Sequence, residues 1–158
     1  MSTVKQFEDL IAWQKARELT KFIYEISKSR HFEIDRGLQD QIRRAAVSVM
    51  SNIAEGFDRG TKAELINYLY IAKGSAGEVK SQLYIARDIG YIDTSEFRNG
   101  VTLADNCSRL LQSFIQRVRA GSQPGLQYKK AVRPEIDLWL ESEMKKAGMD
   151  PNKFKSNL

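Results

Sequence analysis

Cysteine, histidine and proline are scarce in this sequence of 158 residues, and each scarcity excludes a class of protein. The one cysteine, Cys107, cannot form an internal disulfide. Together with the one histidine, His31, it cannot supply the four protein ligands of a structural zinc site. A helical bundle that holds two metals through paired Glu-x-x-His motifs is excluded as well, since it needs two histidines. We therefore expect reducing surroundings, no metal and no cofactor.

Long apolar runs are also missing. No stretch approaches the roughly 18 residues that a membrane-spanning helix needs. The first residues lack both the basic and the apolar region of a secretory signal. The composition, 42% hydrophobic and 28% charged, is ordinary for a globular domain. These features predict a cytoplasmic protein without a membrane partner.

The absence of proline before Pro124 indicates long helices in the first 120 residues. In four segments the apolar residues recur three and four positions apart, which predicts amphipathic helices over about 9–29, 35–55, 61–89 and 93–118. We expect Asp35, Thr61 and Asp93 to cap three of these helices, and Gly90 to end the third in a left-handed conformation. Short connections make consecutive helices return alongside each other. The predicted fold of residues 1–118 is therefore all-α, an antiparallel up-down-up-down four-helix bundle.

The four apolar stripes define the predicted core. They are Ala12, Ala16, Leu19, Ile23 and Ile26; Leu38, Ile42, Ala45, Val49 and Ile53; Leu65, Leu69, Ala72, Ala76, Val79, Leu83 and Ala86; and Phe97, Val101, Ala104, Leu111, Phe114 and Val118. Val47, Met50 and Tyr70 lie outside these stripes. We expect neighbouring subunits to cover some of these three side chains.

Residues 119–158 have a different character. Residues 121–125, Gly-Ser-Gln-Pro-Gly, are typical of a flexible link, and Pro134 suits the first turn of an additional C-terminal helix. Its apolar face would contain Ile136, Trp139, Leu140, Met144 and Ala147. A helix this short is marginal in water unless it docks on its own bundle, on a neighbouring subunit or on a separate partner.

Several motifs carry a resemblance to a known family. They are Phe7-Glu8-Asp9-Leu10, Ala12-Trp13-Gln14-Lys15-Ala16, Gln41-Ile42-Arg43-Arg44-Ala45-Ala46-Val47-Ser48, Ser51-Asn52-Ile53-Ala54-Glu55-Gly56, Lys73-Gly74-Ser75-Ala76-Gly77-Glu78, Gln82-Leu83 and Asp88-Ile89-Gly90-Tyr91-Ile92. Over residues 7 to about 118 the chain resembles the four-helix bundle proteins encoded in intervening sequences of bacterial 23S rRNA genes. The resemblance implies a homopentamer without catalytic activity that binds RNA or DNA. It also implies a distant similarity to the accessory protein of diversity-generating retroelements, a pentamer that binds a reverse transcriptase and nucleic acid.

The residues with catalytic potential lack partners in the sequence. His31 falls in a predicted solvated connection, and Cys107 falls among apolar positions as a small buried hydrophobe. Glu55 could be a binding or catalytic carboxylate, or it could form hydrogen bonds near a helix end while Asn52 fixes register. We favour the second interpretation, because a single carboxylate without a base, a metal or a second acid has no reaction to run. The sequence therefore predicts that the protein is not an enzyme.

Two glycines interrupt the third predicted helix, where each costs about 1 kcal/mol relative to alanine. Gly74, Ser75, Ala76 and Gly77 together form a patch of small residues. Such a patch allows another backbone to approach closely, either within the bundle or across a subunit boundary. The sequence leaves both placements open.

The net charge is +5 and the pI is about 9.3. Arg43 and Arg44 have Asp40 nearby at helical spacing, and Arg109 has Asp105, so we expect these cations to be partly neutralised.

Lys73, Lys80 and Arg87 have no acid three or four positions away, and Tyr84 lies on the same stripe. Cations about 10 Å apart along a helix suit nucleic-acid phosphates, with Tyr84 as a stacking platform. A solvated face and a subunit interface remain open alternatives. Further cations lie in the tail at Lys129, Lys130 and Arg133.

The predicted function is therefore a non-catalytic homo-oligomer that binds nucleic acid, RNA above all. The alternative is a protein-interaction scaffold or accessory subunit, for example of a reverse transcriptase in a diversity-generating retroelement.

Overall fold

The structure is a computed structural model that describes residues 4–121 and 142–146. A short 3-10 helix, η1 (Phe7–Asp9), precedes five α-helices: α1 (Ile11–Ile26), α2 (Arg30–Ile34), α3 (Arg36–Asp58), α4 (Lys62–Asp88) and α5 (Thr94–Arg119). No strand occurs in the ranges that the structure describes. The predicted all-α class is therefore confirmed.

The caps that the sequence predicts are formed at three helix starts. The Asp35 carboxylate accepts a hydrogen bond from the Leu38 amide, and Asp93 forms a reciprocal capping box with Glu96. Thr61 accepts from the Glu64 amide at 3.2 Å, but its hydroxyl donates to the Glu64 carboxylate at 2.9 Å, so Glu64 does not return to the Thr61 amide. Gly90, with φ of 76°, adopts the predicted left-handed conformation after α4.

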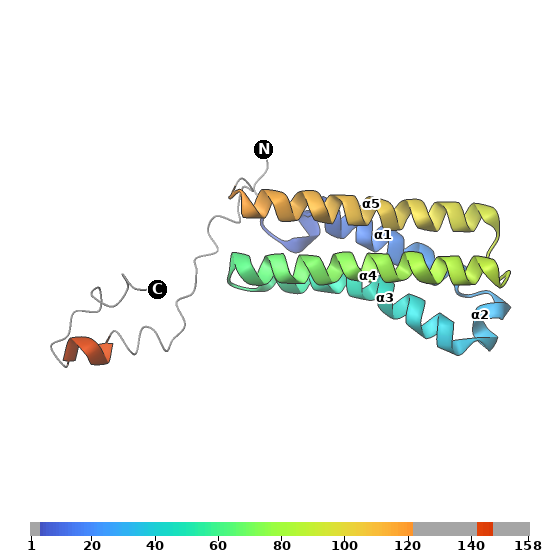
Figure 1. The fold of residues 1–158 in the computed structure, drawn as a ribbon, viewed down its shortest axis with the longest axis horizontal. Helices are drawn as coiled ribbons and strands as arrows, with labels where there is room; N and C mark the ends of the chain where they lie inside the picture. The colour runs from blue at the N-terminus through green and yellow to red at the C-terminus, as the bar shows by residue number, and fades with distance from the viewer. Residues whose placement is uncertain (1–3, 122–141, 147–158) are drawn as a thin grey trace.

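The four long helices α1, α3, α4 and α5 lie lengthwise beside one another (Figure 1). Only residues 59–61 link α3 to α4, and only residues 89–93 link α4 to α5, so each helix turns back along the one before it. α1 packs against both α3 and α5. The result is a helical bundle around one apolar core.

The core contains the predicted stripes almost without exception. Leu38 and Val101 are half-buried and pack against the core, and every other predicted stripe residue is buried. Met50 is half-buried too, whereas Val47 and Tyr70 are exposed. The pattern of apolar residues therefore predicted most of the interior, although Leu10, Phe32, Ala46, Ile92 and Ile115 are buried as well.

Two glycines allow close packing inside the bundle. A Cβ atom on Gly56 would lie 2.7 Å from Tyr68 Cβ, and one on Gly100 would lie 2.8 Å from Leu83 Cδ1 and 2.9 Å from Phe22 Cε1. Gly74 and Gly77 differ, since a Cβ on either would have no atom within 4 Å. This excludes a close approach to Gly74 or Gly77 within the described chain and leaves the placement across a subunit boundary.

Residues 30–34 differ from the prediction. They were expected to be a connection, but they form the short helix α2, in which Phe32 is completely buried. His31 is exposed in α2 and stacks on Tyr91, with the ring centroids 5.4 Å apart. The expected loop is therefore wrong, because this ring contact and the burial of Phe32 hold the segment against the bundle, whereas the expected exposure of His31 is confirmed.

Most of the C-terminal region lies outside the described residues. Residues 142–146, inside the predicted C-terminal helix, are helical. The rest of that helix and the cations Lys129, Lys130 and Arg133 are among the residues not described. None of the described helices is both long and apolar enough to cross a membrane.

Candidate nucleic-acid interface and the polar groove

The predicted row of cations on α4 lies along α5, where each member has a partner. Lys80 Nζ lies 2.8 Å from Asp105 Oδ1, and Lys73 Nζ donates to Gln112 Oε1 at 2.6 Å. The hydrogen bond to Asp105 raises the pKa of Lys80 above its usual range. We call this boundary the α4–α5 seam; it comprises Lys73, Lys80, Tyr84 and Arg87 of α4 and Phe97, Asp105 and Gln112 of α5.

The far end of the seam is aromatic. The Arg87 guanidinium lies 4.6 Å from the centre of the Phe97 ring, and Tyr84 meets the same ring edge-to-face at 4.9 Å. Both Arg87 and Tyr84 remain exposed. The seam therefore contains two cations, Lys73 and Arg87, that have no carboxylate partner among the described residues.

The structure corrects the pairing predicted within single helices. Asp105 contacts Lys80 of α4, whereas Arg109 donates to Asn106. Arg43 turns to α1, where it donates to the Ser27 carbonyl and hydroxyl, and no salt bridge to Asp40 forms in the described part of the chain. For Asp105 and Arg43, contacts to a neighbouring helix replaced the expected contacts one turn away, because packing brought other partners within reach.

A second polar surface follows the boundary between α3 and α4. The Ser48 and Ser75 hydroxyls lie 2.8 Å apart across the boundary, and the Asn52 amide donates to the Ser48 carbonyl and hydroxyl. An open depression beside this contact is lined by Gln41, Arg44, Ala45, Ser48, Glu78 and Gln82. We call this depression the polar groove.

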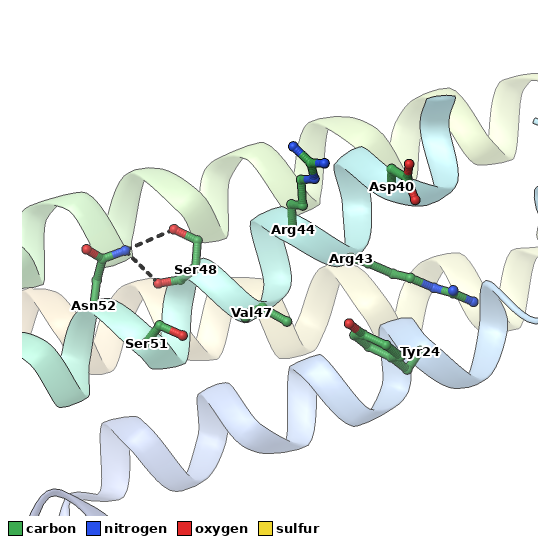
Figure 2. A pocket seen from close by; sticks show the side chains of 8 residues that line it. All are labelled: Tyr24, Asp40, Arg43, Arg44, Val47, Ser48, Ser51 and Asn52. Atoms are coloured by element: carbon green, nitrogen blue, oxygen red, sulfur yellow. Dashed lines mark hydrogen bonds between the residues drawn. The ribbon is translucent and has the colours of Figure 1, made fainter. Parts of the chain in front are cut away.

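A neighbouring depression lies on the other side of α3, toward α1 (Figure 2). Its lining residues are Tyr24, Asp40, Arg43, Arg44, Val47, Ser48, Ser51 and Asn52. In Figure 2 the Arg43 side chain extends toward α1 and Tyr24, and its guanidinium lies 5.1 Å from the centre of the Tyr24 ring. Arg44 leaves α3 in another direction and lines both depressions.

Glu55 is engaged at the end of α3. Its carboxylate accepts hydrogen bonds from Arg59 and from the Tyr68 hydroxyl, both at 2.8 Å. These two bonds, led by that from Arg59, hold the pKa of Glu55 below its usual range. This confirms the interpretation that Glu55 forms hydrogen bonds near the helix end.

The remaining reactive groups have ordinary surroundings. Cys107 is completely buried, and burial raises the pKa of its thiol to about 12. Among residues 4–121 and 142–146, no three His, Cys, Asp or Glu side chains gather in a way that could hold a metal ion.

Comparison with known proteins shows to which family the chain belongs. Residues 8–113 match the family described as 23S rRNA-intervening sequence protein. The chain belongs to this family. A solved structure with a similar fold is a protein of unknown function from the S23 ribosomal protein family of Bacteroides thetaiotaomicron VPI-5482, 24% identical, with a TM-score of 0.61. The match covers 67% of this chain and 99% of that chain. None of the curated proteins compared with this intervening-sequence protein matches it.

Sequence reasoning did not single out the polar groove as a site. Arg44, Ser48 and Gln82 lie in the motifs that carry the family resemblance, but the spacing of Arg44 from Asp40 predicts an ion pair within one helix instead of a site. A signal existed: Gln41, Arg44 and Ser48 recur three and four residues apart, beside the apolar stripe. A polar stripe of this kind predicts a boundary between two helices.

Proposed function

We propose that this intervening-sequence protein is a non-catalytic homo-oligomer that binds nucleic acid, RNA above all, along the α4–α5 seam. The fold we propose in full is an antiparallel up-down-up-down four-helix bundle with an additional C-terminal helix, assembled as a pentamer in the cytoplasm. Family membership supports the assembly, and the residual positive charge of the seam supports the binding. Lys73 and Arg87 carry that charge.

The observation that carries the binding proposal is the chemistry of these two cations. Lys73 donates to a neutral amide, which leaves its full charge, and Arg87 lies on an aromatic ring. They stand 14 residues apart on α4, about 21 Å by helix rise. Arg119 extends the seam, since its guanidinium lies 5.5 Å from the Tyr70 ring. Such a row suits the phosphates of a strand, with exposed Tyr84 available for base stacking.

Lys80 has a smaller part in this proposal. Its ammonium group already pairs with Asp105, so a phosphate would have to compete with a carboxylate at 2.8 Å. We therefore expect two phosphate contacts from the row instead of three.

The test compares two double variants in RNA binding at several salt concentrations. Lys73→Gln/Arg87→Gln should weaken binding to structured RNA and flatten the slope of log K against log salt by about 1.4 to 1.8, which corresponds to two phosphate contacts. Lys28→Gln/Arg30→Gln removes the same charge from exposed positions outside α4 and α5 and should leave most of the slope.

Equal slopes for the two double variants would show that the seam is not the binding surface. Absence of any binding at low salt would instead favour the second function.

The second candidate is a protein-interaction scaffold or accessory subunit, for example beside a reverse transcriptase of a diversity-generating retroelement. The observation in its favour is the apolar outer side of α4, where Ile71 and Ile85 are about half exposed. Support for a non-catalytic role is common to both candidates: Cys107 is buried as a thiol and Glu55 is held by Arg59 and Tyr68.

A further inference from the structure

The exposed side of α4 bears a stripe of residues with an isoleucine at each end. Ile71 and Ile85 lie seven residues before and seven residues after Glu78, and 45% and 48% of their surfaces are exposed. Gly74 and Ser81, both small and exposed, lie between them. Helical spacing of three and four puts all five on one side of α4. We call these five residues the α4 stripe.

Two apolar residues at equal distances from one position suit a two-fold axis at that position, and Ile71 and Ile85 each lie seven residues from Glu78. If two α4 helices pack antiparallel with the axis near Glu78, Ile71 of each copy faces Ile85 of the other. The small residues Gly74 and Ser81 then allow the two backbones to approach closely. The space outside Gly74 is open, because an added Cβ would have no atom within 4 Å.

The charges beside the stripe are complementary to each other. Arg44 and Glu78 line the same polar groove, yet neither forms a hydrogen bond or an ion pair with the residues that the structure describes. The carbonyl oxygen of the Gln82 side chain, in the same groove, is buried without a hydrogen-bond donor among the described residues. A buried acceptor of this kind costs free energy until a donor reaches it. The groove therefore presents one cation, one anion and one acceptor that find no partner in the part of the chain that the structure describes.

We propose that the α4 stripe and the polar groove form a two-fold contact with a second copy of this chain. The rotation carries Arg44 of each copy to Glu78 of the other, so the contact contains two opposite-charge pairs. The two arginines also neutralise the two carboxylates that meet near the axis. A contact of this kind is isologous, with the same surface on both copies.

This contact is distinct from the ring contacts of the proposed pentamer. A closed ring joins two different surfaces of each copy, whereas a two-fold contact joins one surface to itself. The two-fold contact therefore joins two identical units, each of which is stable without the contact. Loss of the contact halves the mass of the assembly. This holds for a pair of single chains and for a pair of rings.

The experiment reverses each charge separately and then mixes the products. Arg44→Glu and Glu78→Arg should each halve the mass measured by light scattering, because each puts like charges together twice in the contact. An equimolar mixture of the two variants should recover the full mass, since each copy then meets its complement. Arg30→Glu makes the same charge change at an exposed position on α2 and should leave the mass unchanged.

Circular dichroism and a thermal melt on each sample separate a lost contact from a lost fold. Recovery by mixing is informative even if one variant is less stable, because only a contact between copies can be restored in this way. Unchanged mass in both single variants overturns the two-fold contact, and so does halved mass that mixing fails to restore. A wild-type protein that is strictly monomeric would overturn both this contact and the proposed assembly, whereas an unaffected pentamer would overturn the contact alone.

Discussion

Cys107 is a titratable residue that the fold removes from water. It is completely buried, and burial raises the pKa of its thiol from 9.0 to about 12, with a smaller effect of the same sign from Glu18. Between pH 9 and pH 12 the unfolded chain loses a thiol proton that the native chain keeps. The stabilisation from the buried neutral thiol is therefore complete below pH 9 and is lost as the pH rises toward 12.

We predict that Cys107→Ala removes this alkaline sensitivity. At pH 7 the variant should be less stable than the wild type, because it loses buried volume. The difference in the free energy of unfolding, measured with urea, should shrink between pH 9 and pH 10.5. Only the wild type has a thiol that ionises more readily in the unfolded chain, so only the wild type loses stability for this reason. Other groups titrate equally in both proteins. A constant difference over this range, or fast reaction of the native thiol with a disulfide reagent at pH 8, would contradict the buried-thiol assignment.

At the same scale, the pairing of Lys80 with Asp105 shows why part of the candidate site was not predictable. The two residues lie 25 positions apart in the sequence. Sequence reasoning can compare residues one helical turn apart, but it cannot place the rotation of one helix against its neighbour. The position of Lys73, Lys80 and Arg87 on one face was predictable from their spacing, whereas their partners on α5 were not.

At the scale of the element, helix starts were the most predictable feature. Asp35, Thr61 and Asp93 each accept the backbone hydrogen bond expected of a cap, because capping depends on neighbours within four residues. The short helix α2 was missed for the opposite reason. Five residues cannot show a helical period, and the burial of Phe32 beside the Tyr91 ring is a contact across 59 residues.

The glycines of α4 and α5 give a prediction about these elements. Gly77→Ala should stabilise the protein by about 1 kcal/mol, because the added methyl group meets no atom within 4 Å and alanine favours the helix. Gly100→Ala should destabilise it by about 1 to 3 kcal/mol, since the methyl group would overlap Leu83 and Phe22.

Urea unfolding of both glycine variants under one condition gives the comparison. The same substitution in two helix interiors then differs only in its neighbours. If Gly77→Ala destabilised the protein, the outer side of α4 around Gly77 would have to be covered in solution, and if Gly100→Ala were neutral, α4 and α5 would have to pack less closely than described.

At the scale of the whole molecule, the two surfaces of α4 have separate roles in what we propose. We propose that the α4–α5 seam contacts nucleic acid and that the α4 stripe with the polar groove joins copies. They lie on different sides of the same helix, so one variant can change one role without touching the other. Assembly then multiplies the number of seams on each particle and should raise affinity for a long strand through effective concentration.

The last prediction follows from this multiplication. Arg44→Glu should weaken binding to an RNA of about 40 nucleotides, long enough to reach seams on two copies, by 10-fold or more. Its binding to an RNA of about 6 nucleotides, which fits one seam, should change little, because Lys73 and Arg87 are intact. Arg30→Glu, with the same change of charge on α2 and an intact contact, should bind both RNAs nearly as the wild type does.

Fluorescence anisotropy with both RNAs, on samples whose mass is measured in parallel, separates the possible causes. Equal losses on the long and the short RNA would mean that Arg44 itself contacts phosphate, since loss of avidity cannot weaken a ligand that reaches only one seam. Mixing Arg44→Glu with Glu78→Arg should restore the affinity for the long RNA together with the mass. If mixing restored the mass but not the affinity, assembly would not be the cause of the tighter binding. Each RNA would then contact the phosphate-binding residues of one seam only.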